Sequence, residues 1–148
     1  MKRIQRQRTR GWRMPEGAII VSRPSLWGNP WSLADVGVTW DLPPAERPAA
    51  AVRLYRKELE HFGLMSDYAY QAPGRTIEAA DRRWDHVNAD IIASGATNMA
   101  EYAAIVLRGH DLVCWCGLCE AHQDGLPAGV KCSDCPPCHA DVLLELAQ

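Results

Sequence analysis

The fold of this chain is decided by residues 111–147, DLVCWCGLCEAHQDGLPAGVKCSDCPPCHADVLLELA. The β-branched and aromatic residues of 111–116 predict a strand, and the apolar spacing of 139–147 predicts a helix at the end of the chain. Between them lies a loop rich in cysteine, glycine and proline. Because α/β proteins build sites where strands end and helices begin, we expect a functional site in this loop.

The cysteine spacing of the loop predicts a metal site. Two C-x-x-C units, 116–119 and 132–135, are separated by twelve residues, and each unit can wrap one turn so that both sulfurs approach one ion. Four thiolates in this pattern complete a tetrahedral zinc site with bonds of about 2.3 Å, and soft thiolates also bind iron. The predicted ligands are Cys116, Cys119, Cys132 and Cys135.

Four further side chains are alternative ligands, namely Cys114, His122, Cys138 and His139. Strand alternation places Cys114 on the same face as Cys116, so that it belongs either to the core or to the site, and it sends Trp115 to the opposite face. At the start of the last helix, the helix dipole lowers the pKa of a thiol and keeps an imidazole neutral, which suits ligation or nucleophilic chemistry at Cys138 and His139. The alternative is that Cys138 caps the turn and His139 is a polar residue of the first turn.

The remaining pattern predicts one small α/β domain, residues 1–148, with a short sheet flanked by helices. Residues 18–23 read AIIVSR and predict a short buried strand between turn residues. Apolar residues at helical spacing predict helices at 48–62, 76–94 and 98–109.

Basic residues crowd the start of the chain, where we expect an arm of residues 1–14. The net charge of -2 gives no global attraction to nucleic acid or anionic membranes, so such a partner would need this local patch. The arm could contact phosphates, although a solvated tail explains the same charges. Its cations are Lys2, Arg3, Arg6, Arg8, Arg10 and Arg13.

The sequence contains no candidate membrane segment. No apolar run approaches the roughly 20 residues that span a bilayer, and the basic start is not followed by the apolar stretch of a signal peptide. We therefore expect a cytoplasmic protein without a membrane partner. In that reducing compartment, six clustered cysteines suit metal ligands or catalytic thiols better than disulfides.

A second candidate site lies in residues 23–31, RPSLWGNPW, which glycine and proline keep from forming a regular element. This loop combines a guanidinium, a hydroxyl, an indole and an amide, which together could hold a phosphate and stack a base or sugar. The candidate substrate-binding residues are Arg23, Ser25, Trp27 and Asn29. The alternative is a structural turn in which the two indoles fill the core.

Motifs of several enzyme classes are missing from the sequence. No histidine is followed two positions later by glutamate, as a zinc deaminase requires, and there is no H-E-x-x-H, G-x-S-x-G or P-loop motif. Cys138 and His139 would need partners from elsewhere to act as nucleophile and base, because neighbours on a helix point in different directions. The candidate catalytic residues are Cys138, His139 and Arg23, and the sequence leaves open whether the protein is an enzyme.

Several segments resemble an uncharacterised family of phage and bacterial proteins, domain-of-unknown-function family 4326. The resemblance rests on residues 8–15 (RTRGWRMP), 23–31 (RPSLWGNPW), 107–109 (LRG), 114–116 (CWC) and 138–143 (CHADVL). It implies a short single domain, often phage-borne and then in the cytoplasm of a bacterium or infected host cell, with no established activity.

This sequence departs from the family pattern at residues 117–137. Family members typically join the Cys-Trp-Cys and Cys-His segments by a few residues, so 117–137 resembles an insertion. The resemblance therefore implies a shared site of Cys114, Cys116, Cys138 and His139 together with the 23–31 loop. The inserted Cys119, Cys132 and Cys135 would extend that site or form a zinc-stabilised flap of their own.

Two hypotheses of function follow. The first is a zinc-binding domain that acts on or binds a nucleotide or nucleic acid, with the 23–31 loop facing Cys116, Cys138 and His139 across a cleft. The second is a non-catalytic zinc-stabilised module whose basic arm engages nucleic acid or a host protein. An enzyme would have a deep pocket with an open metal position or a free thiolate, and a module would have a closed four-cysteine site and a flat surface.

Overall fold

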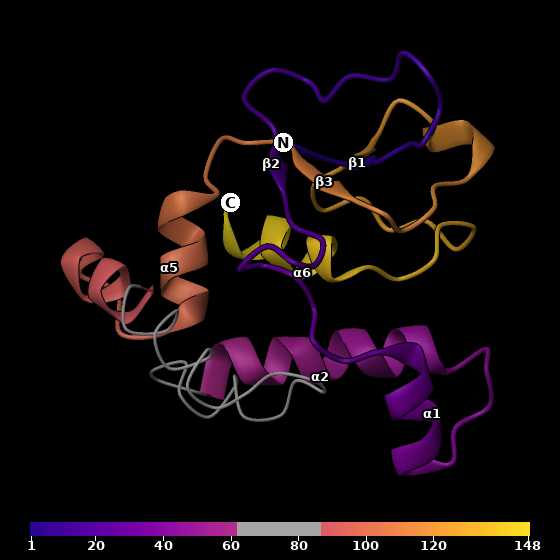
Figure 1. Ribbon diagram of the computed structural model, residues 1–148, viewed down its shortest axis with the longest axis horizontal. Coiled ribbons are helices and arrows are strands. Elements are labelled where there is room, and N and C mark those ends of the chain that lie inside the picture. The colour runs from indigo at the N-terminus through magenta and orange to yellow at the C-terminus, as the bar shows by residue number, and fades with distance from the viewer. Residues whose placement is uncertain (62–86) are drawn as a thin grey trace.

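The strand and helix predicted on either side of the cysteine-rich segment are both present in the computed structural model, which describes residues 1–61 and 87–148. The strand is β3, Leu112–Cys114, and the helix is α6, His139–Leu146. Helix α6 packs against β3 on one side and against α2, Arg47–His61, on the other (Figure 1). The cysteine-rich segment thus starts at the end of β3 and ends at the start of α6, the helix that packs against this strand.

The other described elements confirm the predicted α/β class. In chain order they are β1 (Lys2–Gln5), β2 (Ile19–Ile20), α1 (Leu33–Trp40), α2, α5 (Met99–Val106), β3, the short 3-10 helix η1 (Glu120–His122), β4 (Leu126–Pro127) and α6. Of the helix predicted at 76–94, residues 76–86 lie outside the described residues, whereas 87–94 are helical. No helix among the described residues is long and apolar enough to cross a membrane.

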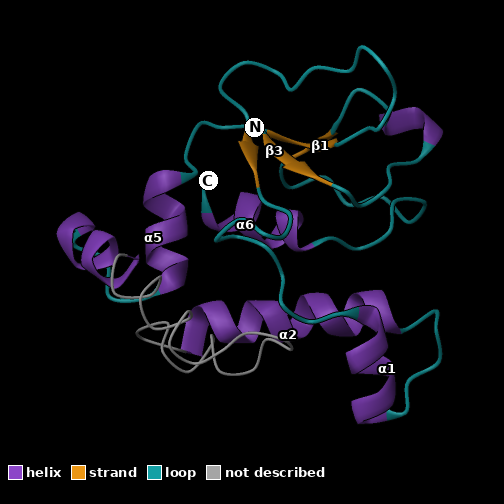
Figure 2. Cartoon of the chain, viewed as in Figure 1, coloured by secondary structure: helices purple, strands orange, loops and turns teal. Residues whose placement is uncertain are grey.

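The described strands form a mixed four-stranded sheet in the order β2-β3-β1-β4, and Figure 2 labels its two central strands, β3 and β1. Strands β1 and β2 both run parallel to β3, and β4 pairs antiparallel with the far edge of β1. Because β1 pairs with β3 from Arg3 opposite Leu112 to Gln5 opposite Cys114, the first residues of the chain lie beside the strand that enters the cysteine-rich segment.

The sheet buries both faces. Leu112 and Cys114 face α6 within the main core, where Leu143 is fully buried. Val113 and Ile4 face the opposite side and form a smaller core. This alternation along the strands is the period of two expected for a pleated sheet.

The start of the chain differs from the expected basic arm of residues 1–14. Residues 2–5 form β1, a strand inside the sheet, and only the residues after it form a loop. The side chain of Arg3 is fully buried. Pairing with β3 on one side and β4 on the other, together with burial of Ile4, stabilises this segment as a strand, although its charges are typical of a solvated tail.

Candidate metal centre

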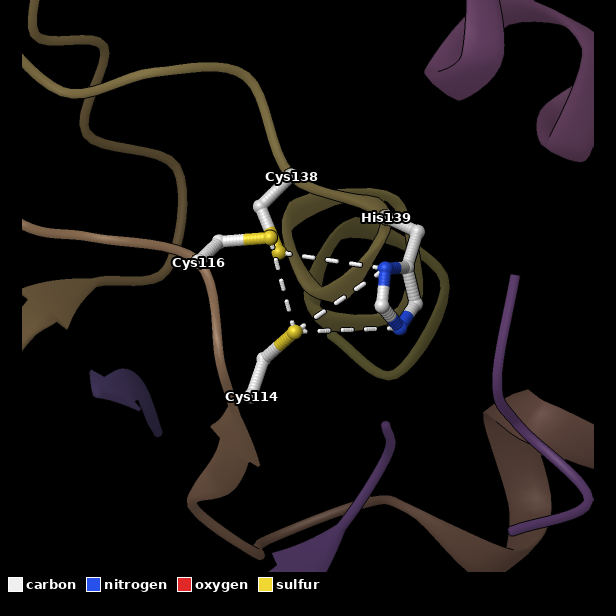
Figure 3. A group of neighbouring side chains, drawn as sticks. All are labelled: Cys114, Cys116, Cys138 and His139. Carbon is white, nitrogen blue, oxygen red and sulfur yellow. Dashed lines mark hydrogen bonds between the residues drawn. The ribbon is translucent and has the colours of Figure 1, made fainter. Parts of the chain in front are cut away.

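Three thiols and one imidazole gather where β3 ends and α6 begins (Figure 3). Cys114 is the last residue of β3, and Cys116 follows two positions later. Cys138 is the N-cap of α6, and His139 is the first residue of that helix. One ligand atom from each of these residues lies within 4.8 Å of all the others. We call these four residues the inner cluster.

The spacing within the inner cluster suits a tetrahedral metal ion. Bonds of about 2.3 Å to sulfur place two thiolates roughly 3.8 Å apart around zinc. The sulfurs of Cys114 and Cys116 are 3.5 Å apart. Nδ1 of His139 lies 4.0 Å from the sulfur of Cys114 and 3.9 Å from that of Cys138. The four residues can therefore hold a metal ion with only small shifts.

The His139 ring is oriented by its second nitrogen. Nε2 lies 2.7 Å from the carbonyl oxygen of Val21, and since a carbonyl only accepts, Nε2 carries a hydrogen and donates it. The same ring makes a T-shaped contact with the ring of Tyr55, with the centroids 5.3 Å apart. Metal-binding histidines commonly donate their other N–H in this way, which fixes the ring and the tautomer. Nδ1 is thus the atom available to a metal.

A buried guanidinium balances the charge of the inner cluster. Arg3 is fully buried and its Nη1 donates to Asp141 Oδ2 at 2.8 Å and to the carbonyl oxygen of Pro136 at 3.1 Å. Burial disfavours its charge, but the sulfur of Cys138 and the carboxylate of Asp141 outweigh burial and raise the pKa of Arg3. Three thiolates and a neutral imidazole around a divalent ion carry a net charge of about -1, which one guanidinium offsets.

Without a cation, the thiols of Cys114 and Cys138 do not ionise together. Hydrogen bonds to Cys116 and Cys138 hold the pKa of Cys114 far below its usual range, whereas those to Cys114 and Cys116 raise the pKa of Cys138 well above its own. Burial opposes a charged imidazole, but hydrogen bonds to Cys114 and Cys116 outweigh it and raise the pKa of His139 to about 10. The cluster shares protons that a metal ion would replace.

A cavity of about 370 Å³ opens onto the inner cluster, within the range of about 300–1,000 Å³ typical of small-molecule sites. All four members of the cluster line this cavity. Its other walls include Arg23, Trp31, Trp115 and the Pro136–Pro137 pair. The cavity is therefore lined by one exposed guanidinium, two indoles and the three sulfurs of the inner cluster.

The 23–31 loop contributes only part of its predicted set to this cavity. Arg23 and Asn29 line it. The amide of Asn29 is engaged by the protein itself, because Nδ2 donates to the Ala51 carbonyl at 3.1 Å and Oδ1 accepts from the Trp31 N–H at 2.9 Å. Asn29 thus holds the loop against α2, and Arg23 is the charged side chain that faces the cavity.

The other two predicted residues of the loop lie away from the cavity. Trp27 is 6% exposed and stacks on Tyr102 with the ring centroids 5.7 Å apart. Its carbonyl accepts a hydrogen bond of 2.8 Å from the Tyr55 hydroxyl. The hydroxyl of Ser25 is buried without a hydrogen-bond partner among the described residues. Trp27 is therefore a core residue, and Trp31 is the indole of this loop that lines the cavity.

The four cysteines predicted to share one ion are divided between two groups. Cys116 lies in the inner cluster, whereas Cys119, Cys132 and Cys135 lie together with His122. We call this second group the outer cluster. Cys116 lies two residues past the end of β3 and beside the start of α6, and this position groups it with Cys114, Cys138 and His139.

A basic and aromatic surface adjoins the cavity. The Trp115 ring is 39% exposed, and the guanidinium carbons of Arg6 and Arg8 lie 4.7 and 4.9 Å from its centroid. These three residues line an open hollow together with Gln5, Gln7 and Thr9. Trp115 also lines the cavity, so the two hollows meet at this indole.

Arg3, Trp31 and Trp115 are the residues of this site to which the sequence did not assign a role. The sequence counts Arg3 among the cations of the basic arm, and a strand of four residues has too few positions to reveal its period. Alternation predicted that Trp115 points away from the cysteines, which is a usable signal for an exposed indole. Nothing in the sequence distinguishes Trp31 from the buried Trp27.

Comparison with known proteins gives one match. A family model described as Domain of unknown function (DUF4326) matches residues 4–148. No curated protein and no solved structure matches the chain. The matched range includes the inner cluster, the outer cluster and the 23–31 loop.

Proposed function

The chain belongs to the family Domain of unknown function (DUF4326), and on this premise we propose that it is a zinc-binding domain that holds a nucleotide or a stretch of single-stranded nucleic acid beside the inner cluster. The observation that carries the proposal is the cavity floored by the inner cluster and bordered by Arg23, Trp31 and Trp115. A guanidinium next to indoles is the pairing that binds a phosphate and stacks a base.

Zinc is the proposed ion because of the donor set. Three thiolates and one imidazole form a common tetrahedral zinc site, and the inner cluster offers this set from a strand end and a helix start. All six cysteines are free thiols, as ligation requires. Iron accepts similar donors, so metal analysis of the purified protein must identify the ion.

The proposed binding path runs from the basic surface into the cavity. Arg6 and Arg8 flank Trp115 on the open side, where a phosphate backbone could lie across the two guanidiniums. Arg23 lies in the cavity, where it could pair with the phosphate of an inserted nucleotide. Trp115 borders both hollows and supplies a face for stacking.

In this proposal Cys138 and His139 act as metal ligands. A catalytic role for either would require it to be free of the ion. Because the inner cluster offers four protein ligands, the site is closed, which is typical of structural zinc. This same observation favours the second candidate, a non-catalytic zinc-stabilised module that engages a partner through its basic surface.

The test is a binding titration of the zinc-loaded protein with the four ribonucleoside monophosphates and with a short single-stranded oligonucleotide. We expect quenching of tryptophan fluorescence on binding. Arg23→Ala should weaken nucleotide binding at least tenfold while leaving the zinc content unchanged. Arg13→Ala removes an exposed cation that lines neither hollow and serves as the matched control.

Oligonucleotide binding should fall with added salt, and Arg6→Ala should reduce the slope of that dependence by about 1, as expected for one phosphate contact. If the zinc-loaded protein bound neither mononucleotides nor the oligonucleotide, the nucleotide proposal would be wrong. The interaction module would then be the function to pursue.

A further inference from the structure

The outer cluster lies within residues 117–137 and is separate from the site proposed for nucleotides. Nδ1 of His122 is 3.1 Å from the sulfur of Cys119 and 3.6 Å from that of Cys135. The sulfurs of Cys119 and Cys132 are 3.9 Å apart. These spacings again match thiolates and an imidazole around one tetrahedral ion, for which two sulfurs lie roughly 3.8 Å apart.

We infer that Cys119, His122, Cys132 and Cys135 bind a second zinc ion of their own, and that this ion holds the 117–137 segment in its folded form. The fully formed protein then carries two zinc ions, each with three thiolates and one imidazole. The second ion is structural, since its four ligands leave no open position.

The backbone around the outer cluster is arranged as in a metal-binding turn. The 3-10 helix η1 brings His122 back toward Cys119, whose carbonyl accepts the His122 N–H at 3.0 Å. The Cys119 N–H points at the sulfur of Cys135 at 3.4 Å. The N–H groups of Asp134 and Cys135 bond to the sulfur of Cys132. Such N–H donors stabilise thiolates, which is the form that binds metal.

Hydrophobic packing alone gives this segment little support. Of residues 117–137, only Leu126 and Cys135 are buried. Its regular structure is limited to η1 and the two residues of β4, which pair with β1. A segment of this length without a core of its own needs a cross-link, and a metal ion supplies one.

The two clusters are joined by two short bridges. Cys116 and Cys119 are separated by two residues and belong to different clusters, and the same is true of Cys135 and Cys138. Each bridge therefore runs from one ion to the other. Because Pro136 and Pro137 form one of these bridges and also line the cavity, the outer ion fixes one end of a cavity wall.

Two measurements on the 148-residue chain test this inference. Zinc analysis should give two ions per chain for the wild type and one for Cys132→Ser, whereas Ser133→Ala, an exposed neighbour that is no ligand, should keep two. Cys114→Ser should remove the inner ion. Cadmium-113 NMR of the wild type should show two resonances, both typical of three sulfurs and one nitrogen, and this result does not depend on any variant.

Limited proteolysis tests the structural role. Lys131 is the only trypsin site within 117–137, and it is exposed. We expect cleavage after Lys131 to be at least tenfold faster in Cys132→Ser than in Ser133→Ala, because loss of the ion releases the segment.

A single cadmium resonance, one zinc ion in the wild type, or fewer than six titratable thiols after removal of metal would overturn the inference. Equal cleavage rates would overturn the structural role. These outcomes leave the proposed function standing, because nucleotide binding concerns the inner cluster and is measured separately. Conversely, two zinc ions in a protein that binds no nucleotide would support the second site and reject the proposed function.

Discussion

Replacing Arg3 by methionine should destabilise the protein and weaken its hold on the inner metal. The change keeps an unbranched side chain of similar length in β1 but removes the charge that faces the Asp141 carboxylate and the Cys138 sulfur. Removing one partner of a buried ion pair costs about 3–5 kcal/mol. Since the Asp141 side chain is 35% exposed, water recovers part of that energy, and we expect a loss of roughly 2–4 kcal/mol.

The effect of Arg3→Met on metal affinity follows from the same charge balance. Without the guanidinium, the metal-loaded inner cluster keeps a net charge of about -1 that no buried cation offsets. Loss of a residue that supports metal ligands by a hydrogen bond or a charge typically lowers metal affinity by about 10–100-fold, and we expect a loss of this size. Competition with a coloured chelator measures this affinity, and urea unfolding of the zinc-loaded protein measures the stability.

The matched control for Arg3→Met is Lys2→Met, which makes the same charge change at the adjacent position of β1, where the side chain is only half-buried. The reasoning is refuted if Arg3→Met and Lys2→Met have the same zinc affinity and unfold within about 0.5 kcal/mol of each other. Asp141→Asn separates the two roles of Arg3, which are its ion pair with Asp141 and its charge beside the sulfurs. This variant breaks the ion pair while the guanidinium still faces the sulfurs.

Three further predictions concern the loop, the neighbouring helices and the pH dependence of stability. Gly28→Ala should lower the free energy of unfolding by about 1–3 kcal/mol, because an added Cβ would lie 2.7 Å from the backbone nitrogen of Arg23. Urea unfolding measures this change, and a variant as stable as the wild type would refute the prediction. Ser32→Ala should lower the free energy of unfolding by about 1 kcal/mol, since the Ser32 hydroxyl caps α1 by accepting from the Asp35 N–H at 3.1 Å. Ser32→Thr should keep most of this stability, because its hydroxyl can both accept from that N–H and donate to the Asp35 carboxylate. Burial raises the pKa of Glu58 from 4.5 to about 7, so the folded protein holds this proton more tightly than the unfolded chain, and stability falls as pH rises from about 4.5 through about 7. Glu58→Gln should therefore be more stable than the wild type at pH 8, by up to about 3 kcal/mol in the free energy of unfolding measured with urea. At pH 5 the difference should be much smaller. A difference that does not change with pH would contradict the raised pKa of Glu58.

Local patterns predicted much of the fold. The spacing of apolar residues correctly indicated which residues are buried in β3, α2 and α6. In α2, for example, Tyr55 is 1% exposed and Leu59 is 2% exposed. These patterns can be recognised in the sequence because buried residues recur at a fixed spacing along a helix or a strand. The elements β1, α1 and β4 were not predicted. Three of the four residues of β1 are charged or polar, α1 contains a glycine, and β4 has two residues of which one is proline.

The sequence by itself determined that this chain has a cysteine-rich segment able to hold metal between a strand and the last helix, because donor type and spacing are local properties. Only the tertiary structure decided which donors meet. Cys114 and His139 are twenty-five positions apart, and they meet because α6 packs on β3; the same packing buries Arg3 beside them. The partition into two clusters follows from which segments meet: Cys116 lies with Cys114 and the start of α6, whereas Cys119 and His122 lie with Cys132 and Cys135. Contacts between segments distant in the chain set these meetings.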